Sequence, residues 1–282
     1  MKLLLIRMYN YAFAKANSYF TRSTLIASML LIASYSVLAE PPINDDYQLV
    51  WADEFDYKGL PDASKWTYEE GYIRNKELQY YTKESLSNAR VADGYLTITA
   101  RKPYRGDPEI TSASLTTENI ADWTYGRIEV RAKLPTQKGM WPAIWTLGSN
   151  IRQVYWPRSG EIDIMEYVTS KLGVIHSNAV YYDYDQQVKR QNNGNATRIN
   201  DIDAFHTYAI DWTPNSITFF VDDKQHHTFM TDVNDKETNP FHKPHYLIMN
   251  LAVGGAWAGA PIPGSFPASF VIDYVRVYQK KP

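Results

Sequence analysis

Short segments in which apolar and polar residues alternate follow one another from about residue 49 to the end of the chain. In residues 127–134, for example, Ile128, Val130 and Ala132 alternate with charged side chains. A period of two is typical of a β-strand with one buried face, and Gly, Pro, Asn or Asp bounds each segment. The pattern predicts an all-β fold, an antiparallel β-sandwich. We expect strands at residues 49–55, 95–101, 127–134, 141–147, 161–168, 174–182, 207–212, 217–221, 246–253 and 270–279.

The expected strand at 161–168 carries three carboxylates among apolar residues: Glu161, Asp163 and Glu166. Strict alternation places the first two on one face but turns Glu166 toward the isoleucines, where an unpaired carboxylate is costly. A β-bulge near Ile164-Met165 adds one residue and re-aims the strand, and such bulges are frequent beside active sites. We therefore predict a bulge that brings all three acids onto one face.

Three interpretations of this acidic face follow from residue chemistry alone. Two carboxylates in a cleft can divide the work of glycoside hydrolysis, one as nucleophile and one as general acid, and the retaining mechanism places them about 5–5.5 Å apart. The acids could instead bind Ca²⁺, although that ion takes six to eight oxygen ligands, usually from loops. A solvated strand face is the third interpretation.

Several motifs together resemble glycoside hydrolase family 16, in the bulged form found in laminarinases, which are endo-β-1,3-glucanases. Besides the acidic strand they are LVWADEFD at 49–56, NKELQYY at 75–81, YGRIEVRAKLP at 125–135, WPAIW at 141–145 and DYVRVY at 273–278. The likeness spans residues 47–279. It implies a jelly roll of two curved sheets with a substrate cleft on the concave face.

The resemblance also implies roles for the three acids. Glu161 corresponds to the nucleophile, Glu166 to the general acid/base, and Asp163 to the group between them that orients Glu161. Physical chemistry supports this order, because the charge of Glu161 raises the pKa of Glu166 and disappears when the glycosyl-enzyme forms. No catalytic cofactor is expected.

Other residues match substrate-binding and metal positions of the family. We expect a polysaccharide or oligosaccharide substrate to be bound by tryptophan platforms and a few polar groups, namely Asn75, Trp141, Trp145, Trp156, His176 and Trp257. A structural Ca²⁺ is expected from two backbone carbonyls and an Asp, at Glu54, Gly94 and Asp273. Core packing of the tryptophans and a solvent-facing Asp273 are the structural alternatives.

Three departures from the family pattern leave the substrate open. Many laminarinases have Trp-Gly where this chain has Ile73-Arg74, an Arg where it has Ser114, and a His where it has Val180. These changes would shift specificity toward mixed-linkage β-glucan or a red-algal galactan. A transglycosylase and a non-catalytic, lectin-like carbohydrate-binding protein remain the alternatives to the leading prediction, a retaining endo-β-1,3-glucanase.

Composition and the N-terminus bear on location and partners. Basic residues precede an apolar run at 25–36, and small residues end at Ala39, so residues 1–39 are predicted to be a cleaved signal peptide. Residues 40–282 are expected to form one catalytic domain, a secreted or periplasmic monomer. The net charge of −2 gives no reason to expect nucleic acid as a partner, nor a membrane after cleavage. The chain has no cysteine, and aromatic residues make up 14% of it.

Overall fold

A computed structural model describes residues 46–103, 108–191 and 196–282 and contains little besides β-strands. Within these ranges no helix is long and apolar enough to cross a membrane. The predicted signal peptide at 1–39 lies outside the described residues. The predicted all-β fold is confirmed.

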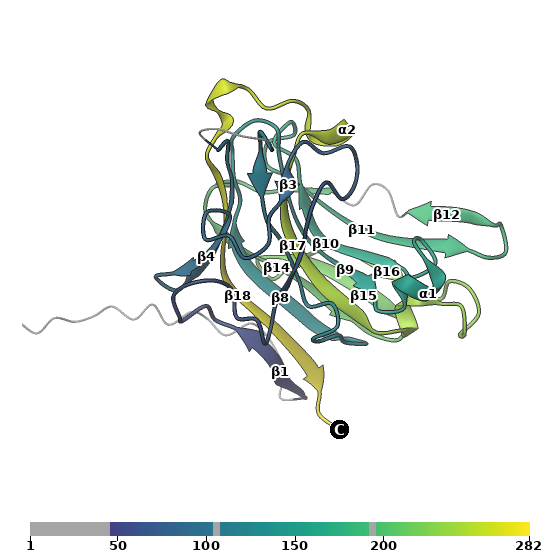
Figure 1. Ribbon diagram of the computed structural model, residues 1–282. Coiled ribbons are helices and arrows are strands. Elements are labelled where there is room, and N and C mark those ends of the chain that lie inside the picture. The colour runs from purple at the N-terminus through teal and green to yellow at the C-terminus, as the bar shows by residue number, and fades with distance from the viewer. Residues whose placement is uncertain (1–45, 104–107, 192–195) are drawn as a thin grey trace, which may run out of the picture. The chain divides into compact units, whose positions relative to one another are not determined.

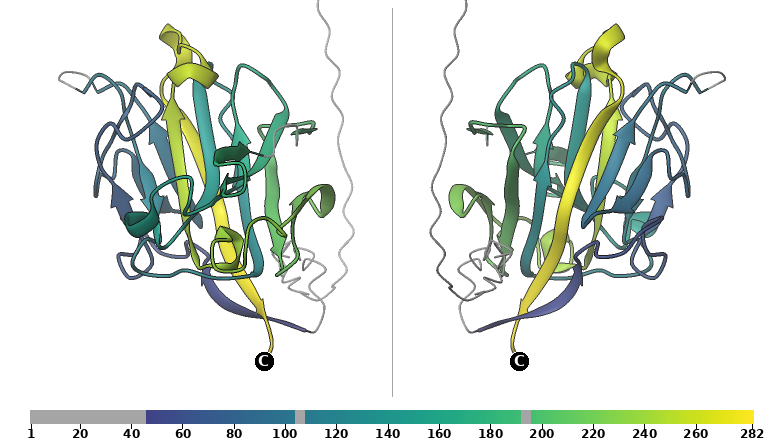
Figure 2. Two further views of the ribbon diagram at one scale, coloured as in Figure 1. Left: turned by 90° about the vertical axis from the view of Figure 1, so that its right-hand side faces the viewer. Right: turned by 90° about the vertical axis from the view of Figure 1, so that its left-hand side faces the viewer.

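Two antiparallel sheets of eight strands form the body of the protein (Figure 1). The first sheet has the order β16-β15-β14-β8-β18-β5-β4, and β1 pairs with the end of β18. The right-hand view of Figure 2 shows β18 running the length of this sheet to the C-terminus. Its strands are β1 (Tyr47–Asp53), β4 (Ala89–Ala92), β5 (Tyr95–Ala100), β8 (Gly126–Lys133), β14 (Phe205–Trp212), β15 (Ser216–Val221), β16 (Lys224–Met230) and β18 (Ala268–Lys280).

The second sheet contains the acidic strand near its middle. Its order is β12-β11-β10-β9-β17-β7-β2, and β13 also pairs with β11. Its strands are β2 (Thr67–Glu69), β7 (Ser114–Thr116), β9 (Met140–Gly148), β10 (Glu161–Tyr167), β11 (Val174–Asp183), β12 (Val188–Gln191), β13 (Ala196–Arg198) and β17 (His245–Val253). A small parallel pair, β3 (Tyr80–Tyr81) with β6 (Thr111–Ser112), and the one-turn helices α1 (Ile151–Val154) and α2 (Gly255–Ala258) lie in the connections.

The main hydrophobic core is supplied by the inward faces of both sheets. Ile128, Val130 and Ala132 of β8 belong to it, as the alternation predicted, together with residues of β10 and β17. A second, smaller cluster contains Trp145 of β9 and Ile248 of β17. Because alternate residues of a strand face opposite ways, this smaller cluster forms an apolar floor on the outer side of the second sheet.

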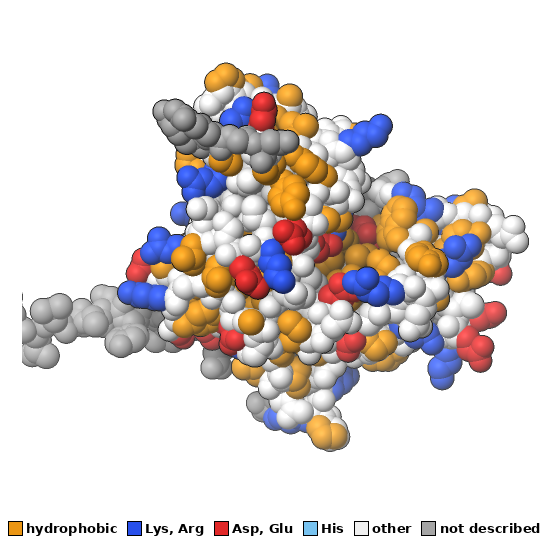
Figure 3. All heavy atoms as spheres, in the orientation of Figure 1, with side chains coloured by type: hydrophobic (Ala, Val, Ile, Leu, Met, Phe, Trp, Pro, Cys, Tyr) orange, Lys and Arg blue, Asp and Glu red, His pale blue; other side chains and the backbone are white. Residues whose placement is uncertain are grey.

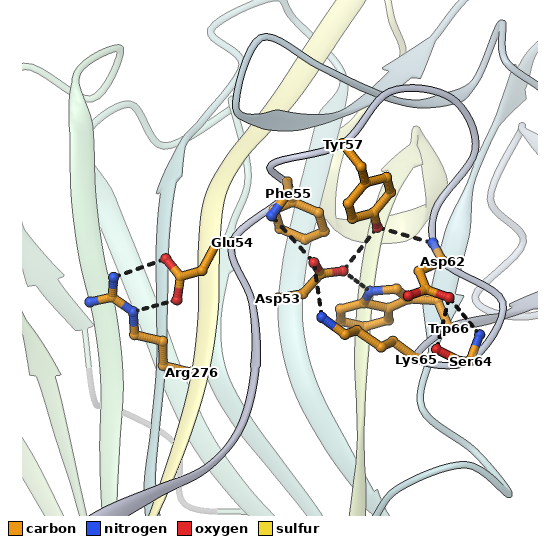
Figure 4. Close-up of polar contacts among 9 residues, drawn as sticks. All are labelled: Asp53, Glu54, Phe55, Tyr57, Asp62, Ser64, Lys65, Trp66 and Arg276. Carbon is orange, nitrogen blue, oxygen red and sulfur yellow. Dashed lines mark hydrogen bonds and ion pairs between the residues drawn. The ribbon is translucent and has the colours of Figure 1, made fainter.

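The segment that follows β1 is tied down by one buried carboxylate. Asp53 is 1% exposed and accepts hydrogen bonds from Trp66 Nε1 at 2.8 Å and from the Tyr57 hydroxyl at 3.0 Å (Figure 4). The Lys65 ammonium lies 3.4 Å from the same carboxylate. Buried charges persist in proteins when paired and hydrogen-bonded in this way, so residues 54–66 are held against the end of the first sheet.

Candidate active site

The predicted bulge is present in β10 and sets the direction of its acidic side chains. Asp163 pairs with Asn178 of β11, but the next pair is Glu166 with His176, so β10 contains one residue more than its neighbour. The pairing with β9 shows the same shift between Asp163 and Met165. Met165 is consequently fully buried in the core, while Glu166 keeps an exposed edge on the same side as Glu161. The predicted bulge near Ile164-Met165, inferred from the cost of burying an unpaired carboxylate, is confirmed.

A cleft of about 590 Å³ lies over this part of the second sheet. The hollow right of centre in Figure 3 has acidic side chains on its rim, with basic side chains beside them. Because the small apolar cluster forms its floor, the cleft combines flat apolar surface with a few polar groups, the composition typical of ligand sites. Its lining includes Glu69, Ile73, Arg74, Asn75, Glu77, Glu118, Trp141, Trp145, Tyr155, Trp156, Glu161, Asp163, Glu166, Tyr246 and Asn250.

Glu161 is held by two hydrogen-bond donors. Trp156 Nε1–H donates to Glu161 Oε2 at 2.9 Å, and the Asp163 carboxyl supplies the second hydrogen bond. Burial raises the pKa of Glu161, whereas these two hydrogen bonds and the positive charges of Arg74 and Lys189 act in the opposite direction. The surroundings therefore oppose the desolvation that would otherwise neutralise this carboxylate.

Asp163 is only 3% exposed and lies between the other two acids. Burial, followed by the charges of Glu161 and Glu166, raises the pKa of Asp163 well above its ordinary value. Asn178 also hydrogen-bonds the Asp163 carboxyl. A carboxyl group that keeps its proton can donate a hydrogen bond, so Asp163 serves as a donor to Glu161.

Glu166 combines burial with a nearby negative charge. Trp141 Nε1–H donates to Glu166 Oε1 at 3.1 Å. Burial, and then the charge of Glu161, raise the pKa of Glu166 to about 8. One strand thus carries a carboxylate supported by hydrogen-bond donors and a carboxyl group that remains protonated at neutral pH, the division of labour needed for acid-assisted bond cleavage.

The cleft contains four of the six expected substrate-binding residues. Asn75, Trp141, Trp145 and Trp156 line it. Trp257 and His176 do not line it: the Trp257 ring centroid is 5.2 Å from that of Trp141, and the His176 ring centroid is 4.9 Å from that of Trp257. These three rings therefore form a row that begins at Trp141, the hydrogen-bond partner of Glu166.

Two of the departures from the family pattern, Arg74 and Ser114, meet at Glu69. The Arg74 guanidinium lies over the Trp145 ring, 4.8 Å from its centroid, and forms an ion pair with Glu69. The Ser114 hydroxyl donates to the other oxygen of Glu69 at 2.6 Å. Arg74 therefore covers one face of Trp145, which is only 8% exposed, and a sugar can stack on that face only if the arginine moves.

Several residues of the site were not selected from the sequence. Asn178 and Asn250 hold Asp163 and Trp145, respectively. Lys189 lies 5.0 Å above the centroid of the Trp156 ring. Polarity within a predicted strand was an available signal for Asn178 and Asn250, but finding their partners requires the strand register, which the sequence pattern does not supply.

The expected calcium site is not supported by the side chains at its positions. Only Asp273 was expected to bind the ion through its side chain; the Glu54 side chain forms two hydrogen bonds with Arg276, at 2.8 and 2.9 Å (Figure 4). Asp273 forms an ion pair with Arg131, and a guanidinium beside a carboxylate repels a metal cation. Gly94 lies in the turn between β4 and β5. Among the described residues, no group of three or more His, Cys, Asp or Glu side chains suits a metal ion.

Comparison with known families agrees with the fold and with the geometry of the acidic strand. Residues 75–276 match the family described as "Glycosyl hydrolases family 16". This match covers more than half of the chain and includes all three acids of β10 and the tryptophans of the cleft. The protein belongs to glycoside hydrolase family 16 and is a glycoside hydrolase.

Individual relatives include enzymes that act on β-glucans. A beta-glucanase of Rhodothermus marinus is 47% identical over 245 residues, covering 83% of this chain and 85% of that protein. The laminarinase structure from Rhodothermus marinus has a TM-score of 0.76 and 44% identity, covering 84% of this chain and 98% of that one. A mutant of SCLam, a non-specific endo-β-1,3(4)-glucanase, carries 1,3-β-D-cellobiosyl-glucose at its active site; its TM-score is 0.76 and its identity 42%, with coverage of 86% and 98%.

Proposed function

We propose that this protein is an endo-β-1,3-glucanase that cuts internal bonds of β-1,3-glucans such as laminarin by a retaining double displacement. The similarity to laminarinases and to a 1,3(4)-glucanase supports the substrate. The arrangement of the acids on β10 supports the mechanism. The observation that carries the proposal is the bulged strand β10, which places Glu161 and Glu166 in one cleft, each accepting a hydrogen bond from a tryptophan N–H.

The first step forms a covalent glycosyl-enzyme. The Glu161 carboxylate attacks the anomeric carbon, the bond from that carbon to the glycosidic oxygen breaks, and the proton of Glu166 passes to the departing oxygen. Asp163 donates its hydrogen bond to Glu161 and keeps that side chain oriented. The pKa of Glu166 then falls, because the ester carries no charge to oppose its ionisation.

The second step releases the sugar. Glu166, now ionised, takes a proton from water while the water oxygen attacks the anomeric carbon from the face opposite Glu161. The ester bond breaks, the Glu161 carboxylate is restored, and the product keeps the configuration of the substrate. If a second sugar hydroxyl takes the place of water, the same intermediate gives transglycosylation.

A substrate panel tests the proposal most directly. We expect purified enzyme to cut laminarin internally into short oligosaccharides, lichenan more slowly, and cellulose not at all, because a curved cleft favours the curved β-1,3 chain over the flatter β-1,4 chain. Reducing-sugar release measures the rates, chromatography of early products distinguishes internal from terminal cleavage, and NMR of fresh products reports the anomeric configuration.

The same panel separates the alternatives. Agarose and carrageenan serve as galactan controls, and faster cleavage of either one than of laminarin would overturn the substrate proposal while leaving the family intact. Binding of laminarin without release of reducing ends would instead indicate a carbohydrate-binding protein. Longer products with no net gain of reducing ends would indicate a transglycosylase.

We also propose that residues 1–39 direct export to the periplasm or the medium and are removed after Ala39. The basic residues, the apolar run and the small residues at the cleavage positions support this proposal. Protein recovered outside the cytoplasm should have the mass of a chain that begins at Glu40. Recovery of the intact chain only from the cytoplasm would contradict it.

A further inference from the structure

Two contacts in series connect Glu161 to a strand at the edge of the sheet. Trp156 lies in the connection between α1 and β10, and its indole N–H donates to Glu161 Oε2 at 2.9 Å. The Lys189 ammonium lies over the ring of the same tryptophan, 5.0 Å from its centroid. Lys189 belongs to β12, the edge strand beyond β11, so it reaches the site from outside the three strands that form the floor and the acidic centre.

Trp156 needs support of this kind because the core does not hold it. Its side chain is 46% exposed, and Tyr155 before it is 69% exposed. A partly exposed indole can leave the orientation that its hydrogen bond to Glu161 requires. Lys189 is also exposed, but its backbone is fixed on a paired strand: it lies directly across from Tyr182 of β11, and its ammonium donates to Gln191 Oε1 at 3.4 Å.

We propose that Lys189 is a positioning residue for catalysis: its contact with the Trp156 ring keeps the indole N–H on Glu161 Oε2 and so holds the carboxylate in the orientation from which it attacks. A cation over an indole ring is a favourable electrostatic contact, and tryptophan is the ring that binds cations best. The inference rests on the proposed function, because it takes Glu161 as the nucleophile.

The charges around Glu161 give Lys189 a second, electrostatic effect. Asp163 and Glu166 face Glu161 from its own strand, Arg74 from the connection between β2 and β3, and Lys189 from β12. Burial raises the pKa of Glu161, and the two cations oppose that rise. Removing the charge of Lys189 should therefore raise the pKa of Glu161, so that a higher pH is needed to ionise the nucleophile.

The test compares Lys189→Met with Lys189→Arg in the full enzyme, on laminarin. Methionine keeps an unbranched chain without the charge, so we expect kcat to fall about threefold to tenfold. We expect KM to change less and the acidic limb of the kcat/KM profile to move to higher pH. Lys189→Arg should retain near wild-type kcat and an unshifted acidic limb, because a guanidinium also binds an indole face.

Arg158→Met is the matched control. Arg158 lies 4.5 Å from the centroid of the Tyr182 ring, in the same region, but does not contact an acid of the cleft. Its loss should leave kcat and the acidic limb near wild type. A wild-type kcat and acidic limb in Lys189→Met would overturn the inference, and so would an equal loss in Arg158→Met. If Glu161→Ala were still active, the proposed function itself would fail, which is a separate result.

Discussion

Glu161→Ala is expected to lose laminarin hydrolysis by roughly four orders of magnitude or more, the scale seen when a covalent nucleophile is removed. The loss should fall on kcat, because the side chain forms the bond to the anomeric carbon. Folding should not suffer, since burial raises the pKa of Glu161 and its ionised form is therefore not favoured by the folded site. Initial rates and single-turnover measurements on laminarin provide the test.

Two further measurements separate lost chemistry from lost structure in this variant. The melting temperature should be no lower than that of the wild type, and laminari-oligosaccharides should still bind, as calorimetry can show. Glu237→Ala removes an exposed glutamate outside the cleft and serves as the matched control for a Glu-to-Ala change. This control variant should be fully active. Hydrolysis by Glu161→Ala at a rate near that of the wild type would rule out Glu161 as the nucleophile.

Glu166 is expected to produce the basic limb of the pH profile. The general acid must be protonated, so kcat/KM should fall as pH rises through about 8, the pKa that burial and the charge of Glu161 give to this group. Glu166→Ala should lose this limb together with most activity on laminarin. On an aryl glycoside with a good leaving group it should still form the glycosyl-enzyme, which then accumulates for lack of a base.

Azide rescue identifies the position of the missing base. The small anion should enter the space left by Glu166 and attack the intermediate, which restores turnover and gives a β-glycosyl azide. Lack of both rescue and azide adduct would argue against Glu166 as the acid/base.

Glu166→Gln adds a stability test: a carboxyl group whose pKa is raised on folding stabilises the protein below its unfolded pKa of about 4.5 and loses this effect as pH rises toward 8. The melting temperature of Glu166→Gln should therefore decline less over that range than the melting temperature of the wild type.

The fold and the centre of the site could be predicted because both depend on local alternation. Each of the ten expected strands is present, with ends that differ by one or two residues. The bulge at Ile164-Met165 followed from one conflict, a carboxylate that regular alternation would bury among isoleucines. Such a conflict is visible in a single strand, since it requires no knowledge of which strand lies alongside.

The side-chain contacts of Glu69 and Asp273 could not be predicted, because their partners come from segments far apart in the chain. Glu69 and Ser114 are 45 residues apart, and their hydrogen bond depends on the pairing of β2 with β7. The expected calcium site was carried over from the resemblance alone. The pairing of β18 with β8 places Arg131 beside Asp273, a contact that the alternation along either strand did not reveal.

The bulge in β10 also determines where this enzyme can change length. Losing one residue from an ordinary strand turns every later side chain to the opposite face, which exposes the core and buries polar groups. In β10 both neighbouring strands already pass over one residue after Asp163. A deletion of Met165 would leave Glu161, Asp163 and the final glutamate at strictly alternating positions, all on the cleft side, and the pairing beyond them unchanged. The strand that bears the chemistry can therefore lose one residue after Asp163 without turning its later side chains to the opposite face.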